Sequence, residues 1–208
     1  MSKHVGIAAD LGALLAPHGL QPLGDCLDGD STITLIGPDE PAFWPIFAAC
    51  PEYKDGQPDP MDRWSTRIIG ELAVTLDAEP LFPFGGPPYA PFFTWAKQTG
   101  RFWTSPIGFL VHDTAGLFTS FRGALRWKKP AEIGSNQKPC LTCAQPCASA
   151  CPVGAFIDGY DVAACKAHVA SEAGATCRAG GCLARRACPV GRGTRLPAQS
   201  AFHMEAFL

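Results

Sequence analysis

The sequence predicts an α+β fold, in which an α+β domain over residues 1–127 precedes a small cysteine-rich module over residues 140–208. Separate helix-like and strand-like patterns follow one another along the first part of the chain, as is typical of an α+β domain. The module is indicated by cysteine density, because eight of the ten cysteines lie between Cys140 and Cys188. The polar, proline-bearing stretch 128–139 is typical of a linker between the two.

Four helices are predicted in the first domain. Apolar residues recur at helical spacing over 1–19, which predicts an amphipathic helix. A second, short helix is expected to begin at Pro41. A third is expected to begin at Asp59 and Pro60, because aspartate is a good N-cap and proline suits the first helical turn. A fourth is expected over 91–98.

Strands are predicted at three places in the same domain. Residues 31–36 (STITLI) are apolar and β-branched, so they predict a short buried strand. Residues 81–84 predict another, which ends in the glycine- and proline-rich loop that follows. Apolar residues alternate in 107–111 and again in 117–121, on either side of the turn-forming residues 113–116, and this pattern predicts a hairpin.

The overall charge argues against polyanionic partners. The formal net charge of -2 lacks the basic excess that usually accompanies binding to nucleic acid or anionic membrane, so tRNA is not expected as a partner. No apolar run approaches the roughly 20 residues that a membrane-spanning helix needs, and no membrane partner is expected. Lys3 and Asp10 interrupt any signal-peptide core. The sequence therefore predicts a cytoplasmic protein.

A local excess of positive charge, which we call the basic rim, surrounds the late cysteines. Between residues 163 and 195, Glu172 is the single acidic residue, and six residues are cationic: Lys166, Arg178, Arg185, Arg186, Arg192 and Arg195. A solvated surface is one interpretation of such residues. The other is that the basic rim tunes a bound redox centre or docks an acidic partner.

The first four cysteines of the module have a spacing typical of an iron-sulfur site. Their pattern is Cys140-x2-Cys143-x3-Cys147-x3-Cys151, and a proline follows the last. It resembles the bacterial ferredoxin run C-x2-C-x2-C-x3-C-P, with one residue added. The sequence Cys-Pro-Val-Gly that begins at Cys151 recurs at Cys188, which indicates two copies of one local structure.

Eight thiolates predict two [4Fe-4S] clusters, and the ferredoxin pattern implies that the last cysteine of each group ligates the other cluster. This pattern assigns Cys140, Cys143, Cys147 and Cys188 to one cluster, and Cys151, Cys165, Cys177 and Cys182 to the other. Cys165 is expected on a helix that begins at Asp161, with His168 one turn further along.

Other interpretations of the cysteines remain open. Zinc sites made of cysteine also use close pairs, usually two C-x2-C pairs, and a zinc-stabilised tRNA-binding module would be the corresponding function. Disulfides or free thiols are a second interpretation. A single cluster is a third, because the second group of cysteines is loosely spaced. Cys26 and Cys50 lie outside the module and are expected to be buried free thiols without a role.

The order of the cysteines over residues 140–191 is similar to that in the C-terminal module of epoxyqueuosine reductase, a cobalamin-dependent iron-sulfur enzyme of tRNA modification. Four cysteines end in Cys-Pro, one follows on a predicted helix, and three more end in Cys-Pro. The resemblance implies a ferredoxin-like two-cluster module.

Two stretches of the first domain look like the cobalamin-processing decyanase and dealkylase family, which has a nitroreductase-like α+β fold. They are 59–62 (DPMD) and 111–123, which contains Val-His-Asp and Phe-Arg-Gly. The resemblance implies a cobalamin, or a flavin, held against the sheet near the hairpin. The matching positions are His112, Gly116, Phe118 and Arg122, with Phe84, Gly85 and Gly86 in a loop that would form a wall.

Together these features predict an iron-sulfur electron-transfer protein that passes electrons to a corrinoid bound by the first domain, as a reductase resembling epoxyqueuosine reductase would. The alternative is a ferredoxin-type carrier with a docking domain and no substrate of its own. It is favoured by the absence of an evident acid, base or nucleophile near the expected cofactor, since residues 81–88 contain no carboxylate. Whether the chain is itself an oxidoreductase is left open. A reductase, a ferredoxin or a flavodoxin is the expected electron donor.

Overall fold

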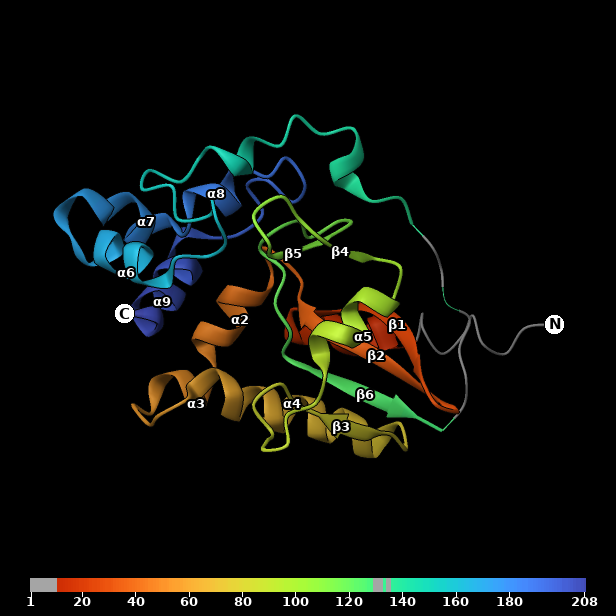
Figure 1. Ribbon diagram of the computed structural model, residues 1–208. Coiled ribbons are helices and arrows are strands. Elements are labelled where there is room, and N and C mark those ends of the chain that lie inside the picture. Colours follow the sequence, from red (N-terminus) through yellow and green to blue (C-terminus); the bar gives the residue numbers. More distant parts are fainter. Residues whose placement is uncertain (1–10, 129–132, 134–135) are drawn as a thin grey trace. The chain divides into compact units, whose positions relative to one another are not determined.

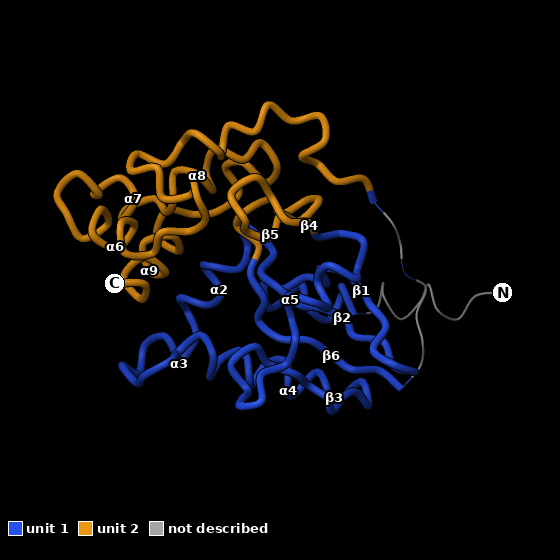
Figure 2. The backbone as a smooth tube through the Cα atoms, viewed as in Figure 1, with its two compact units in different colours: residues 1–102, 120–136 blue, residues 103–119, 137–208 orange. Residues whose placement is uncertain are grey.

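The computed structural model describes residues 11–128, 133 and 136–208. They form a mixed α+β structure with a small antiparallel sheet, and this confirms the predicted class (Figure 1). Figure 2 shows that they divide into two compact units. Unit 1 contains the described residues up to 102 and those within 120–136, and unit 2 contains 103–119 and 137–208. Within the described residues, no helix has the length and apolarity that crossing a membrane requires.

Unit 1 is built on a four-stranded antiparallel sheet. The strands are β1 (Leu20–Asp28), β2 (Ser31–Pro38), β6 (Gly123–Trp127) and β3 (Glu79–Leu81), and they lie side by side in that order. The strand predicted at 31–36 is confirmed as β2, whose residues from Thr32 onward are all buried. Its neighbour β1 was not predicted, because proline, glycine and aspartate interrupt its pattern and the pairing with β2 is irregular between Pro22 and Gly24.

Helices cover this sheet and complete its core. α4 (Pro60–Thr75) packs against β6 and β3, while α5 (Phe92–Gln98) packs against β1 and β2 (Figure 1). The apolar stripe of α4 is buried, as its helical spacing predicts. α2 (Phe43–Ala49) and α3 (Pro51–Lys54) precede it. Aromatic side chains from α2 and α4 contact one another inside unit 1.

Three local predictions in unit 1 need correction or completion. The strand predicted at 81–84 is wrong, because β3 ends at Leu81 and the chain then turns, with the amide of Gly85 donating to the carbonyl of Phe82 at 3.2 Å. Asp59 does not cap α4 with its side chain, because it adopts a left-handed conformation with φ of 51°, and only its carbonyl accepts hydrogen bonds from the helix. The helix predicted over 1–19 falls partly outside the described residues. Residues 11–15 are helical and continue into the 3-10 helix η1 (Ala16–His18).

Unit 2 consists of a small two-stranded sheet and the cysteine-bearing segments. Strands β4 (Phe102–Thr104) and β5 (Leu110–His112) pair, and their connection is closed by the amide of Ser105, which donates to the carbonyl of Phe109 at 2.9 Å. Short helices follow: η2 (Pro139–Leu141), η3 (Pro146–Ala148), α6 (Val162–Ala170), η4 (Glu172–Gly174), α7 (Ala175–Gly180), α8 (Leu183–Arg186) and α9 (Pro197–Phe207). α6 confirms the predicted helix, since the Asp161 carboxylate caps it by accepting the amide hydrogen of Ala164 at 2.9 Å.

The predicted hairpin of 107–111 with 117–121 is wrong. The hairpin is formed by β4 and β5 instead, and 117–121 is not a strand. The physical reason lies in the backbone acceptors of residues 117–119. Their carbonyl groups accept hydrogen bonds from the side chains of Arg185 and Arg195, so they are not available to a partner strand.

The division into units also differs from the expected boundaries of 1–127, 128–139 and 140–208. Residues 103–119 belong with the cysteine segments, although the sequence places them inside the first domain. The cause is a shared buried cluster, in which Ile107, Val111 and Leu117 pack with Cys147 and Cys188. Burial of this apolar surface ties the β5 region to the module.

Candidate functional site

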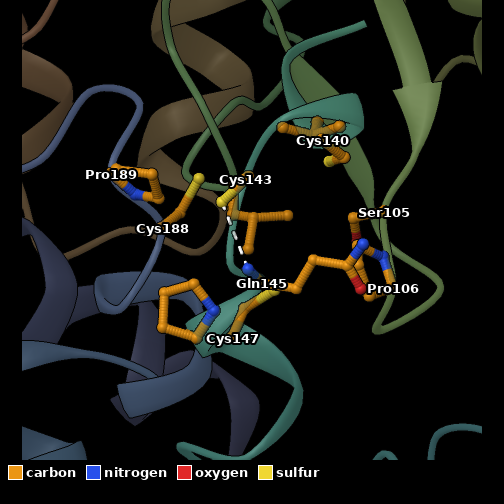
Figure 3. A pocket seen from close by; sticks show the side chains of 11 residues that line it. Ser105, Pro106, Cys140, Cys143, Gln145, Cys147, Cys188 and Pro189 are labelled. Carbon is orange, nitrogen blue, oxygen red and sulfur yellow. Dashed lines mark hydrogen bonds between the residues drawn. The ribbon is translucent and has the colours of Figure 1, made fainter.

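Four cysteines from two separate segments, 140–147 and the one that carries Cys188, line one pocket in unit 2 (Figure 3). They are Cys140, Cys143, Cys147 and Cys188. The pocket holds about 260 Å³ of space, part of it open to solvent. Val111 and Leu117 contribute apolar wall. The structure thus brings together the four cysteines that the ferredoxin pattern assigned to one cluster, although Cys188 is remote from the others in sequence.

The electrostatic environment of the pocket opposes the accumulation of thiolates. Burial raises the pKa of Cys140, and the charges of Cys188 and Cys143 raise it further. Burial likewise raises the pKa of Cys147, and so do the same neighbours together with Cys140. The neighbouring thiols therefore make Cys140 and Cys147 harder to deprotonate. A bound cation at the centre would reverse this effect, because metal ligation stabilises the thiolate form.

Backbone amides donate hydrogen bonds to two of the cysteine sulfurs. The amide of Gln145 lies 3.3 Å from Cys143 Sγ (Figure 3), and Gln145 reaches this position in a left-handed conformation with φ of 55°. The amide of Ala155 lies 3.4 Å from Cys151 Sγ. Such N–H···S bonds stabilise thiolates and help to set the potential of iron-sulfur clusters.

The two Cys-Pro-Val-Gly sequences adopt similar turns, as their repetition predicts. The final glycine is left-handed in both, with φ of 62° at Gly154 and 65° at Gly191. The second copy also fits closely against the turn after β5. A Cβ atom on Gly191 would lie 2.9 Å from the carbonyl oxygen of Ala115, and one on Gly116 would collide with the carbonyl of Val190. This interlocking holds the segment that carries Cys188.

The second group of cysteines is partly brought together. Cys165 lies on α6 and Cys182 directly precedes α8. Burial raises the pKa of Cys182, and hydrogen bonds from the backbone amides of Arg185 and Ala184 lower it. The charge of Cys165 raises the pKa of Cys182 as well, which indicates that the two cysteines are neighbours. Cys151 and Cys182 pack against the same buried cluster as Cys147 and Cys188.

Tyr160 and His168 contact this second group. Burial and a hydrogen bond with Cys165 raise the pKa of the Tyr160 hydroxyl. Its ring stacks on Phe156 at 5.0 Å and meets Phe109 edge-on at 5.1 Å. Nε2 of His168 lies 3.7 Å from Cys177 Sγ. The position of His168 follows from the predicted helix, whereas the role of Tyr160 was missed because no spacing pattern includes it.

The four cysteines of the pocket have the chemistry that an iron-sulfur cluster requires of its ligands. Four thiols around one hollow match the ligands of a [4Fe-4S] cluster, in which each thiolate binds a different iron. In the parts of the chain that the structure describes, no three histidine, cysteine or acidic side chains approach closely enough to hold a single metal ion. All ten cysteines are free thiols, and Cys26 and Cys50 are buried as predicted. Burial raises the pKa of Cys26 to about 12.

The residues expected at a corrinoid or flavin site divide between the two units. His112, Gly116 and Phe118 belong to unit 2, while Arg122, Phe84, Gly85 and Gly86 belong to unit 1. His112 is fully buried and its Nδ1 accepts the amide hydrogen of Ala115 at 3.1 Å, while its Nε2 lies 3.2 Å from the Asp113 carboxylate. His112 therefore organises the turn after β5.

The remaining expected cofactor residues also have contacts within their units. The guanidinium groups of Arg185 and Arg195 lie 4.9 and 5.1 Å from the centre of the Phe118 ring. Arg122 lies 3.7 Å from the Asp62 carboxylate, and burial lowers the pKa of its guanidinium. Phe84 stacks on Phe82 at 5.2 Å. Gly85 is exposed, and a Cβ on Gly86 would lie 2.6 Å from the amide nitrogen of Tyr89.

Much of the basic rim is tied to backbone carbonyl groups of unit 2. Arg178 donates to the carbonyls of Val169 and Ser171, and Arg192 donates to that of Ala187. Lys166 lies over the ring of Phe207 at 5.3 Å. The rim thus includes structural contacts as well as surface charge.

No family model, curated protein or solved structure matches this chain.

Proposed function

We propose that this chain is an iron-sulfur electron-transfer protein that holds two [4Fe-4S] clusters in unit 2. One cluster would be bound by Cys140, Cys143, Cys147 and Cys188, and the other by Cys151, Cys165, Cys177 and Cys182. The observation that carries the proposal is the pocket that Cys188 shares with the first three cysteines. In a two-cluster ferredoxin, the fourth ligand of each cluster comes from the other group of cysteines, whereas a single local metal site needs no such distant ligand.

The surroundings of the thiols support ligation by iron. Burial and the neighbouring thiols raise the pKa of Cys140 and Cys147, so this grouping gains little unless a cation joins the sulfurs. When bound, the clusters would supply two one-electron carriers. The protein contributes amide donors to the sulfurs of Cys143 and Cys151, apolar walls that limit water, and nearby arginine charge, all of which influence reduction potential.

Iron content and electron paramagnetic resonance test the proposal. Anaerobically purified protein should contain about eight iron ions per chain, the content of two four-iron cubanes, and should give reduced [4Fe-4S] signals with dithionite. Cys188→Ser should lower the iron content by about half, because it removes one ligand of one cluster. Cys50→Ser serves as the matched control, since it removes a buried thiol from unit 1. Protein that binds zinc and no iron would refute the proposal.

The electron acceptor in this proposal is a corrinoid held by the N-terminal domain of residues 1–127, a nitroreductase-like domain coupled to a ferredoxin-like module as in epoxyqueuosine reductase. Its support is the paired resemblance of 59–62 with 111–123 and of the cysteine order. Titration with cobalamin, followed by absorption and by the cobalt signal in electron paramagnetic resonance, tests it. A parallel titration with flavin mononucleotide tests the flavin alternative.

A ferredoxin-type carrier is the second candidate function. The observation that favours it is that His112, Phe118 and Arg122 have intramolecular contacts, as described above. If the protein binds neither cobalamin nor flavin but exchanges electrons with a ferredoxin or a flavodoxin reductase, the carrier function is supported and the corrinoid acceptor is refuted. Both functions place the protein in the cytoplasm.

A further inference from the structure

Arg185 is held beside the second cysteine group by neutral acceptors. It lies in α8, three residues after Cys182. Its Nε donates to the carbonyl oxygen of Leu117 at 2.6 Å, and a terminal nitrogen reaches that of Thr119 at 3.5 Å. Its guanidinium also lies 4.9 Å from the centre of the Phe118 ring. Among the described residues, no carboxylate forms an ion pair with Arg185.

A positive charge in this environment is stabilised by an anion. Arginine remains protonated in proteins, so the partial burial of Arg185 imposes a desolvation cost that neutral carbonyl groups and one ring offset only in part. Cys182 is the N-cap residue of α8, and the backbone amide of Arg185 donates a hydrogen bond to its sulfur. The anionic partner that the site provides is therefore the thiolate of Cys182, together with what that thiolate binds.

We propose that Arg185 is the counter-charge of the cluster bound through Cys182, and that it raises the reduction potential of this cluster above that of the cluster in the Cys140 pocket. This inference rests on the proposed function. One electron taken up from a donor makes a cluster more negative by one charge, and a nearby fixed cation stabilises that product. The effect is strong where water is limited and weak for solvated charges.

The two cysteine sites differ in this respect. Arg185 lies beside Cys182, whereas the cation near Cys140 is Lys138, a half-buried residue that directly precedes η2. A fixed guanidinium that is tied to two carbonyl groups maintains its position when the redox state changes. Electrons that enter unit 2 are then expected to collect on the cluster at Cys182.

The test is a redox titration of the anaerobic, iron-loaded full chain with dithionite, followed by electron paramagnetic resonance. In Arg185→Gln, the ratio of reduced to oxidised cluster at a fixed potential should fall about tenfold for one cluster, equivalent to about 59 mV for one electron, and should not change for the other. Arg185→Lys should retain most of the wild-type ratio because it retains the charge. Arg192→Gln removes an exposed charge of the same basic rim and should change neither cluster appreciably.

Different results would overturn the role of Arg185 and the proposed iron-sulfur function. If both clusters load in Arg185→Gln and neither shifts, or if both shift equally, the inference is overturned. A shift of the same size in Arg192→Gln also overturns it, because the whole rim would then act. If Arg185→Gln loses the second cluster, the result for Arg185→Lys is used instead. A second cluster that loads in Arg185→Lys with nearly the wild-type potential supports the role of the charge. Failure of that cluster to load in Arg185→Lys overturns the inference. Wild-type protein without iron would refute the proposed function itself.

Discussion

Gly116 meets two constraints at once in the turn after β5. Its φ of 63° is a conformation that other residues adopt only at a cost, and a side chain there would collide with the carbonyl of Val190. Because Val190 follows Cys188 and Pro189 closely, the space beside Gly116 is occupied by the segment that positions a proposed ligand. A small residue is thus required for packing around the site.

Gly116→Ala should destabilise unit 2 and weaken iron binding through Cys188. Left-handed strain costs about 1 kcal/mol, and the clash adds a further 1–3 kcal/mol on the scale of overpacked interiors. Thermal unfolding and iron content measure the effect. Gly108→Ala is the matched control, because Gly108 has a φ of 79° but no atoms within 4 Å of a Cβ, so it carries the strain without the clash. Equal losses in the two variants would contradict the packing argument.

Glu52 provides a test of pH dependence at the level of one ion pair. Its carboxylate accepts hydrogen bonds from Arg67 at 2.5 and 3.1 Å, and this contact lowers the pKa of Glu52 to about 2. Since the folded-state pKa lies below the ordinary value of about 4.3, the stabilisation is present above that value and is lost as the pH falls towards 2. Arg67 is well exposed, so the contribution should not exceed about 1 kcal/mol.

We therefore expect Glu52→Gln to lower the melting temperature slightly at pH 7 and to leave it unchanged near pH 2. Carboxyl chemical shifts from nuclear magnetic resonance measure the pKa of Glu52 directly. An ordinary pKa for this carboxyl group, or an equal effect of the substitution at both pH values, would argue against the Arg67 contact.

At the scale of elements, α6 depends on its N-cap. The mean hydropathy of this nine-residue helix is high but its apolar residues do not form one face, so its start is defined mainly by the Asp161 carboxylate that accepts the Ala164 amide hydrogen. Cys165 lies one turn further along, and His168 lies on the same helix. The cap therefore helps to position a proposed ligand and the contact with Cys177.

Asp161→Ala should destabilise α6 by about 1 kcal/mol, the usual cost of a lost N-cap, and should reduce loading of the second cluster more than that of the first. Asp161→Asn retains a capping oxygen and should restore both properties. Amide hydrogen exchange in 162–170, together with iron content, measures the change. Normal protection of these amides in Asp161→Ala would show that the cap is dispensable.

The whole molecule consists of one unit with a conventional apolar core and another rich in cysteine. Unit 1 buries aromatic and aliphatic side chains between its sheet and helices. In unit 2, cysteines make up part of the buried cluster around Leu117 and Val111. If iron joins these thiols, unit 2 should depend on the metal for stability much more than unit 1 does, because metal-binding free energy contributes to folding only where the ligands lie.

Removal of iron with a chelator should therefore accelerate amide exchange in 140–191 while β2 and β6 stay protected. Mass-spectrometric hydrogen exchange of the full chain, with and without iron, measures this difference. Restoration of the iron and sulfide should reverse it. Uniform loss of protection across both units, or no change in either, would contradict a metal-dependent unit 2.

Local sequence patterns predicted the α+β class, the helices α4, α5 and α6, the strand β2 and the cysteines of the proposed sites. These features depend on local composition and spacing, which one stretch of chain carries alone. The grouping of Cys188 with Cys140 was expected from the ferredoxin pattern, and both line one pocket. Tertiary structure alone shows that 103–119 joins the cysteine segments and that the carbonyl groups of 117–119 bind arginine side chains instead of a strand. Such pairings depend on which buried surfaces and hydrogen-bond acceptors of distant segments meet, and no local pattern encodes them.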